Sequence, residues 1–236
     1  IGVMGMNLSQ KRVLVVGMGV TGKSCARFCL GKNARVTVTD QNPQALTDLE
    51  KADLEALGIR VILGNEGLLL ASASDIVVLS PGVSHTLAPL EKAANEGVLV
   101  LGEIELASRF LSIPIVAVTG TNGKTTVTSL IGDMLTASGK RVFVGGNIGT
   151  PLVDLVDHAG EKDIAVVEVS SFQLDTIIDF RPQVAVLLNV ADDHLDRYIE
   201  FIDYARSKER IFQNQTASDT AVFNAEDPSI IDMAKR

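Results

Sequence analysis

The sequence has little of what would mark a nucleic-acid-binding, disulfide-rich or membrane protein. Its 21 Lys and Arg residues are outnumbered by 29 Asp and Glu, and the formal charge of −8 argues against general nucleic-acid binding. Anionic small ligands remain possible, because loop amides and a few lysines bind them locally. Only two cysteines occur, Cys25 and Cys29, so we expect packing residues and not a disulfide or a metal site.

Long apolar runs and targeting segments are also lacking. No apolar stretch reaches the length of a membrane span, and no signal peptide is recognisable. Low-complexity segments and fixed-period repeats are missing as well. We therefore expect a cytoplasmic protein that does not enter the membrane.

What the chain does contain is an alternation of strand-like and helix-like runs. With 236 residues, 46% of them apolar and 21% charged, it suits two modest α/β domains with parallel sheets. We place the boundary near Ser112 and predict domains at residues 8–112 and 113–236. The predicted strands are Arg12–Val16, Arg35–Thr39, Arg60–Leu63, Asp75–Leu79, Val98–Leu101, Ile115–Thr119, Arg141–Val144, Ile164–Glu168, Val184–Asn189 and Thr220–Phe223. The predicted helices are Gly22–Gly31, Ala45–Leu57, Lys124–Ser138 and Ile199–Asn214.

The first predicted strand leads into a glycine loop, VVGMGVTG, that fits G-x-G-x-x-G. Gly17 would permit the tight turn, Gly19 the approach of a phosphate, and Gly22 close packing of helix against strand. Asp40 closes the second strand, where a carboxylate commonly accepts hydrogen bonds from a ribose. The loop indicates NAD, another nucleotide or a plain turn. The later LSPGV turn, with Ser80 and Gly82, is either plain or a further source of phosphate-binding amides.

A second loop follows the strand Ile115–Thr119 and precedes a helix. Its residues are Gly120, Thr121, Asn122, Gly123, Lys124, Thr125 and Thr126. The end matches the phosphate-binding pattern G-x-x-x-x-G-K-[ST], although Val118 stands at the first glycine position. Successive amides would form an anion site, Lys124 would reach the outer phosphates, and the Thr125 hydroxyl could ligate Mg²⁺. We therefore predict an ATP site, with a helix-capping turn as the alternative.

Two polar positions end apolar strands of this second domain. Glu168 lies at the carboxyl end of its strand, where open α/β sheets bind ligands, and would either ligate Mg²⁺ or form an ion pair. His194 follows a later strand in an acidic turn and is either a ligand or a capping residue. The fold predicted from these motifs is a Rossmann-like domain followed by a P-loop-type ATP-binding domain.

Several motifs together resemble the Mur ligases. GTNGKTT, GGNIGTPL, VEVSSFQLD, NVADDHLDRY and YARSKERIF occur in the order found in that family, and SSFQLD with DDHLDRY resembles its D-glutamate-adding member. The likeness covers nearly the whole chain from Lys11. It implies that the first domain holds the UDP of a sugar-peptide substrate and that the second binds ATP.

The resemblance also implies a reaction and its residues. ATP would activate the terminal carboxylate of UDP-N-acetylmuramoyl-L-alanine as an acyl phosphate, which the amine of D-glutamate then attacks. Two Mg²⁺ ions would take part, with catalytic and metal-binding roles falling on Lys124, Thr125, Glu168, His194 and Lys208. The substrate-binding positions implied are Val20, Thr21, Asp40, Ser80, Gly82, Asn147 and Ser170.

Lys208 is interpreted differently with and without the resemblance. Together with Arg206 and Arg210 it reads as a solvated basic helix face. The family likeness instead implies a carbamylated lysine, in which CO₂ turns the amine into an anion that can bind Mg²⁺; this requires a neutral amine.

The last residues of the sequence lead us to expect a fragment of a longer protein. The turn Asn224–Pro228 followed by a helix-like run does not resemble a domain terminus, so we expect a fragment that binds substrate, is inactive alone and is monomeric. The alternatives are a non-catalytic nucleotide-binding module and an NAD-dependent oxidoreductase. The oxidoreductase explains the first loop and Asp40 but leaves Lys124 and Glu168 without a purpose.

Overall fold

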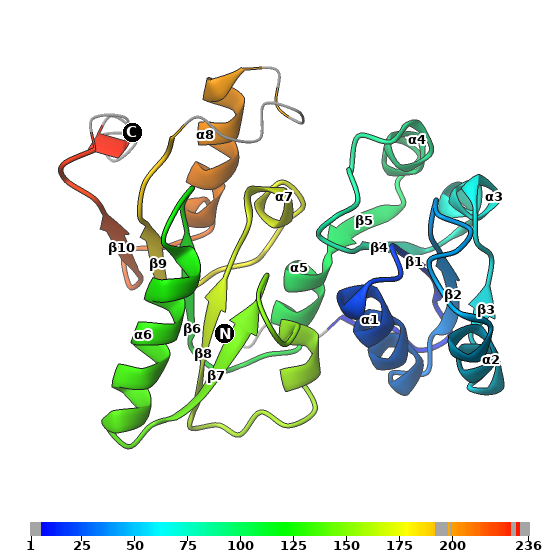
Figure 1. Cartoon of the computed structure of the whole chain (residues 1–236), viewed down its shortest axis with the longest axis horizontal. Helices are drawn as coiled ribbons and strands as arrows, with labels where there is room; N and C mark the ends of the chain where they lie inside the picture. Colours follow the sequence, from blue (N-terminus) through cyan, green and yellow to red (C-terminus); the bar gives the residue numbers. More distant parts are fainter. Residues whose placement is uncertain (1–5, 192–197, 199, 228–229, 232–236) are drawn as a thin grey trace. The chain divides into compact units, whose positions relative to one another are not determined.

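The computed structural model describes residues 6–191, 198, 200–227 and 230–231. The chain divides into two compact units between Phe110 and Leu111, here called the first and second units. Each unit is built on its own sheet of five parallel strands (Figure 1). Within the described residues, no helix is both long and apolar enough to cross a membrane.

The sheet of the first unit has the strand order β3-β2-β1-β4-β5. Its strands are β1 (Arg12–Val16), β2 (Arg35–Thr39), β3 (Arg60–Val61), β4 (Ile76–Leu79) and β5 (Leu99–Gly102). Its helical segments are α1 (Val20–Gly31), α2 (Asp48–Ala56), α3 (Asn65–Leu68), the 3₁₀ turn η1 (Ala71–Ala73), α4 (Ala88–Asn95) and α5 (Glu103–Ser108). The chain reverses its direction of winding at β1, which pairs with β2 on one side and β4 on the other. Such a reversal is the usual ligand-binding point of an open α/β sheet.

Apolar strands buried on both faces hold the first unit together. Residues Val13 to Val16 of β1 are all at most 1% exposed, as expected for the central strand of a covered parallel sheet. Leu14 and Val16 pack in one cluster with residues of α3, η1 and α4. Cys25 and Cys29 are buried in α1 and form no disulfide among the described residues, which confirms the prediction that they are packing residues.

The second unit has the strand order β10-β9-β6-β8-β7. Its strands are β6 (Ile115–Thr119), β7 (Arg141–Gly146), β8 (Asp163–Glu168), β9 (Val184–Leu187) and β10 (Thr220–Phe223). Its helical segments are α6 (Lys124–Ala137), η2 (Leu152–Leu155), α7 (Ser171–Leu174), α8 (Phe201–Glu209) and η3 (Arg210–Phe212). Here the winding reverses at β6, between β8 and β9. Helix α6 packs along β6, β7 and β8, while α7 and α8 contact each other (Figure 1).

Local capping explains several differences from the predicted elements. Helix α1 begins at Val20 and not Gly22, since Gly19 is its N-cap. Helix α2 begins at Asp48 and not Ala45, because Thr47 forms a capping box with Glu50. Strand β9 ends at Leu187, two residues before the predicted end, where the chain turns into the loop that carries Asn189.

Candidate functional site

The glycine loop of the second unit joins β6 to α6 at the point where the strand order reverses. Gly120 has a φ of 154° and Gly123 a φ of 81°, values that side-chain-bearing residues rarely adopt. A Cβ on Gly120 would also lie 3.0 Å from the Cβ of Leu188. Both glycines are therefore needed for this turn, and Gly123 is the N-cap residue of α6.

The loop is fastened to the end of the neighbouring strand β9 through Asn189. The amide of Thr121 donates to the Asn189 carbonyl at 3.0 Å. The amide of Asn122 donates to Asn189 Oδ1 at 2.8 Å, and Asn189 Nδ2 donates back to the Asn122 carbonyl at 3.0 Å. Two of the loop amides are thus already used by the protein. Sequence reasoning placed Asn189 at a strand end but did not foresee this role.

The remaining amides lie at the beginning of α6. Within the described residues, the backbone N–H groups of Lys124, Thr125 and Thr126 have no hydrogen-bond partner. The first N–H groups of a helix carry a partial positive charge and attract phosphate. The side chain of Lys124 folds back over the loop, where Nζ donates to the Thr121 carbonyl at 2.9 Å. This arrangement suits an anion at the N-terminus of α6.

A buried carboxylate adjoins the loop. Glu168 ends β8, pairs with Val118 of β6 and is 3% exposed. Its Oε2 accepts from the Thr125 hydroxyl at 2.7 Å, and its Oε1 accepts from Asn147 Nδ2 at 3.0 Å. Among the described residues Glu168 forms no ion pair, so the structural alternative foreseen for it is not observed.

The chemistry of these oxygen donors suits a hard cation. A carboxylate and a hydroxyl in contact, beside a predicted phosphate site, are ligands that Mg²⁺ prefers, with the phosphate and water supplying the others. No three His, Cys, Asp or Glu side chains in the described part of the chain gather into a metal-binding group. Thr125 and Glu168 could therefore hold Mg²⁺ only together with a ligand that brings its own oxygens.

Lys208 lies beneath the same loop and not on a solvated face. It is 1% exposed, its Nζ donates to the Gly120 carbonyl at 3.0 Å, and it lies 4.5 Å from the ring centroid of Tyr204. The neighbouring Arg206 is exposed, and Arg210 donates to the Ile177 carbonyl at 2.9 Å. The interpretation of these three residues as one solvated basic face was wrong, because α8 turns its Lys208 side towards the sheet.

Two tyrosines connect the loop to the segment after β8. The hydroxyl of Tyr204 is 3.1 Å from Thr121 Oγ1. Tyr198 donates to Asp175 at 2.7 Å and lies 3.2 Å from Ser207 Oγ, and burial raises the pKa of this phenol so that it stays neutral. Neither tyrosine was predicted as a site residue; both occur in quoted motifs, but only the packing of α8 shows what they contact.

Ser170 caps the short helix α7. Its Oγ accepts from the Gln173 amide at 3.3 Å, and its own amide is bound by Gln173 Oε1 at 3.0 Å. Gln173 is 2% exposed, and its Nε2 has no hydrogen-bond partner among the described residues. The predicted residue His194 lies outside the described residues.

In the first unit, the loop after β1 adopts the close packing expected from its glycines. Gly17 has a φ of 94°. A Cβ on Gly22 would lie 1.7 Å from the Gly17 carbonyl oxygen, whereas one on Gly19 would meet no atom within 4 Å. The predictions that Gly17 permits the turn and that Gly22 allows close helix–strand packing are confirmed. Ser80 Oγ holds the turn by donating to the Gly17 carbonyl at 2.8 Å.

Asp40 is joined to this loop by hydrogen bonds. Its Oδ2 accepts from the Met18 amide at 2.7 Å, and its Oδ1 accepts from the Asn42 amide at 2.9 Å. Val20 is 69% exposed and Gly82 is also exposed, while Thr21 is half-buried. The residues predicted for a nucleotide diphosphate thus lie around the carboxyl ends of β1, β2 and β4.

Comparison with known proteins matches both units. Residues 118–236 match the family model described as Mur ligase middle domain, and residues 11–102 match the model described as Mur ligase MurD-like, N-terminal domain. A curated relative from Desulfosudis oleivorans is 54% identical over 225 residues, covering 95% of this chain and 49% of the relative. One from Desulfatibacillum aliphaticivorans is 50% identical over 219 residues, covering 93% and 49%. Both are named UDP-N-acetylmuramoylalanine--D-glutamate ligase, and this chain spans about half the length of each.

Solved structures agree on the fold. The structure described as UDP-N-acetylmuramate:L-alanyl-gamma-D-glutamyl-meso-diaminopimelate ligase from Neisseria meningitides has a TM-score of 0.61 at 21% identity, covering 96% of this chain and 75% of that one. A murein peptide ligase from Psychrobacter arcticus gives 0.55 at 18% identity, covering 95% and 51%. At this identity the likeness concerns the fold alone. With family models matching both of its units, the chain belongs to the Mur ligase family.

Proposed function

We propose that this chain is the nucleotide-binding part of an ATP-dependent ligase that joins D-glutamate to UDP-N-acetylmuramoyl-L-alanine. The observation that carries the proposal is the contact between Thr125 and Glu168 at 2.7 Å beside the free amides of α6. An oxidoreductase would have no role for this pair of a hydroxyl and a carboxylate. The names of relatives about half identical to the chain support the choice of substrates.

The proposal gives each domain one nucleotide. Residues 8–112 would bind the UDP end of the substrate, with Val20, Thr21, Asp40, Ser80 and Gly82 around the diphosphate and uridine. Residues 113–236 would bind ATP through the loop from Gly120 to Thr126. The exposed space above Gly19 supports the first assignment, because a phosphate can approach the backbone there.

The reaction has two steps. The terminal carboxylate of the alanine attacks the γ-phosphorus of ATP, ADP leaves, and an acyl phosphate forms. The amine of D-glutamate then attacks the acyl carbon and loses a proton, and inorganic phosphate leaves as the amide forms. Because the carboxylate and the phosphate are both anionic, the protein acts mainly by neutralising charge and aligning the reactants.

Different residues of the second unit would neutralise charge and align the reactants. Lys124 would leave its contact with the Thr121 carbonyl and bind the outer phosphates. Mg²⁺, when bound at Thr125 and Glu168, would supply positive charge to the phosphate oxygens. Asn147 Nδ2 donates to Glu168 Oε1 at 3.0 Å and orients this carboxylate, and Asn147 and Ser170 would contact the muramoyl-alanine part.

A carbamylated Lys208 and a second Mg²⁺, held with the help of His194, belong to the same proposal. Support for the modification is the burial of Lys208 at 1% exposure against a carbonyl oxygen, because a buried ammonium group costs free energy and a neutral amine is what reacts with CO₂. Mass spectrometry of the intact chain in bicarbonate buffer, compared with Lys208→Met, tests it. A monomer in the cytoplasm is also part of the proposal.

Calorimetric titration with UDP-N-acetylmuramoyl-L-alanine, and separately with NADH, tests the assignment of the first unit. We expect saturable binding of the UDP-sugar and no heat of binding with NADH. Binding of NADH alone would reject the ligase in favour of an oxidoreductase.

A matched pair of variants on α6 tests the second unit. Thr125→Val removes the hydroxyl that contacts Glu168, whereas Ser129→Ala removes an exposed hydroxyl one turn later. In a titration with ATP and Mg²⁺ we expect Thr125→Val to weaken binding about tenfold, equivalent to ~1.4 kcal/mol, and Ser129→Ala to leave it unchanged. Equal affinity of the two variants would contradict the proposed metal site.

A further inference from the structure

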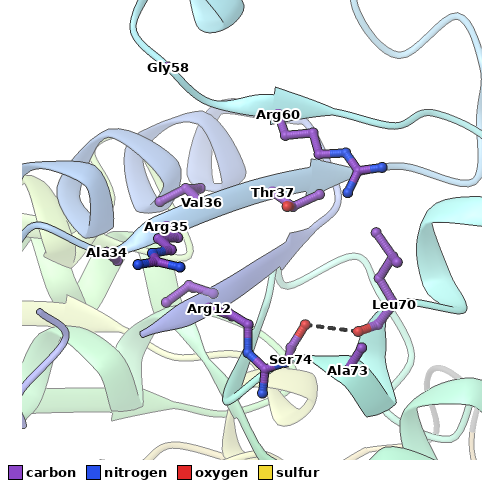
Figure 2. Close-up of a pocket in the computed structure, with 11 residues that line it drawn as sticks. Arg12, Ala34, Arg35, Val36, Thr37, Gly58, Arg60, Leu70, Ala73 and Ser74 are labelled. Carbon is purple, nitrogen blue, oxygen red and sulfur yellow. Dashed lines mark hydrogen bonds between the residues drawn. The ribbon is translucent and has the colours of Figure 1, made fainter. Parts of the chain in front are cut away.

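A pocket of about 520 Å³ lies in the first unit (Figure 2), at the amino ends of β1, β2 and β3. Its arginines, Arg12, Arg35 and Arg60, are the first residues of β1, β2 and β3. The glycine loop follows the carboxyl end of β1, so the two lie at opposite ends of the same strand. None of the residues that line the pocket has a role in the function proposed above.

The strand register places the arginines on one face of the sheet. Arg12 pairs in register with Arg35, and Thr37 pairs in register with Arg60. Side chains alternate along a strand, so Arg35 and Thr37 project to the same side, and their partners on the neighbouring strands share it. On the other side of the pocket, Ser74 donates a hydrogen bond to the Leu70 carbonyl at 2.9 Å (Figure 2).

The positive charge of the pocket is only partly neutralised. Arg12 forms an ion pair with Asp75 at 2.8 Å. Arg35 donates to the neutral side-chain oxygen of Gln10 at 3.2 and 3.0 Å. Arg60 has neither an ion pair nor a hydrogen bond with the described residues. Among the described residues, one carboxylate is thus ion-paired with the three guanidinium groups of the pocket, and guanidinium does not lose its proton in proteins.

The size of the pocket suits a small molecule. Its volume falls within the range of about 300–1,000 Å³ typical of ligand sites. Val13 and Val36 also line it, but by the same alternation their buried side chains project to the opposite face of the sheet. Figure 2 shows the three guanidinium groups apart from one another, which favours a ligand with several anionic groups over a single ion. The chain's charge of −8 disfavours a nucleic acid as the partner.

We propose that this pocket binds a small molecule carrying two or more linked phosphate groups. Arg35 and Arg60 hold the phosphates, and Arg12 is a third contact. Arginine presents paired N–H donors whose geometry matches phosphate oxygens. The site is separate from both glycine loops, so its occupation requires neither ATP nor the UDP-sugar. Its loss would leave the proposed ligase function intact.

Tripolyphosphate is the probe, titrated without Mg²⁺ into the ¹⁵N-labelled chain and followed by NMR. The reporters are the backbone amides of Thr37, Gly58 and Ser74, which line the pocket; this separates binding here from binding at the glycine loops. We expect their shifts to saturate. The double variant Arg35→Gln and Arg60→Gln should raise the Kd obtained from these shifts at least tenfold. The control is Arg27→Gln, an exposed arginine of α1 outside the pocket, which should leave the Kd unchanged.

Unchanged amide shifts elsewhere in the spectrum would show that the double variant is folded. Shifts at the three reporters that do not saturate, or the same Kd in the double variant and the parent, would overturn the proposal. Citrate is the comparison ligand, since it carries several carboxylates and no phosphate. Equal affinity for citrate would reject the assignment to phosphate.

Discussion

The substitution Gly22→Ala tests whether close packing of α1 against the β1 turn supports the first unit. The added Cβ would lie 1.7 Å from the Gly17 carbonyl oxygen and 2.9 Å from Ser80 Oγ. Ordinary contacts between such atoms are about 3.5 Å, so the helix or the turn must move by well over 1 Å. Overpacking of this kind costs about 1–3 kcal/mol, and the better helix propensity of alanine returns up to ~1 kcal/mol.

We therefore expect Gly22→Ala to lower the free energy of unfolding by about 2 kcal/mol. With a urea dependence of about 2 kcal/mol per molar, the unfolding midpoint should fall by about 1 M. Circular dichroism in urea measures the midpoint, and hydrogen exchange of peptides covering Val13–Val16 assigns the loss to the first unit. Binding of the UDP-sugar should weaken as well, because the displaced turn is the one that we propose to face the diphosphate.

The matched control is Gly31→Ala in the same helix. A Cβ there would meet no atom within 4 Å, so only the helix propensity changes and the midpoint should rise or stay the same. If Gly22→Ala behaves like Gly31→Ala, the contact with the Gly17 carbonyl does not support the fold and the reasoning is refuted.

Three further predictions concern other parts of the chain. A hydrogen bond from the Arg181 guanidinium lowers the pKa of Asp219 to about 2, below its ordinary value near 4. The stability that this carboxylate contributes is complete above about pH 4 and is lost as the pH falls towards 2, so Asp219→Asn should be less acid-sensitive than the parent when urea midpoints at pH 7 and pH 3 are compared. Burial raises the pKa of the Cys29 thiol to about 12, and Cys25 is also buried; a thiol reagent such as Ellman's should modify both only after unfolding, and rapid reaction of the native chain would contradict their burial. Asn189→Ala removes two hydrogen bonds that hold the loop of the second unit, each worth ~1 kcal/mol, and should weaken ATP binding about three- to tenfold in calorimetry, whereas unchanged affinity would show that the loop keeps its shape without them.

The strands were predictable because central parallel strands are apolar on both faces. Arg12–Val16, Arg35–Thr39, Ile115–Thr119 and Thr220–Phe223 have the predicted bounds in the structure. In the central strands β1 and β6 the apolar runs end at glycine loops, which sets the limits locally, whereas the edge strand β10 is largely exposed.

Short helices were not predictable in the same way. Helix α5 has only six residues, and it buries the carboxylates of Glu103 and Glu105 at 1% and 0% exposure. A pattern of apolar residues cannot reveal a helix whose buried positions include acids. Glu105 is retained in the core because Arg109 donates to it at 2.6 Å, a partnership visible only once the helix has formed.

In the candidate site, too, residues set by the local sequence were predictable and residues set by tertiary packing were not. Thr125 and Glu168 were predictable because one follows a glycine loop and the other ends an apolar strand, and both positions are local. The burial of Lys208 depends on how α8 packs on the sheet, and sequence periodicity alone favoured a solvated position for it. The hydrogen bond between Asn122 and Asn189 joins residues that are 67 apart in the sequence, so no local pattern could predict it.

The all-parallel pairing of both sheets has a consequence for how the chain folds. In the described strands each neighbour is reached through a crossover, so no hairpin can form early and every pairing closes a long loop. The bond from Ser80 to the Gly17 turn spans 63 residues, and that from Asn122 to Asn189 spans 67. During synthesis each glycine loop leaves the ribosome well before the strand that will hold it. Each glycine loop therefore acquires its final contacts only after that later strand has paired, and until then the apolar strands β1 and β6 each lack a partner along one edge.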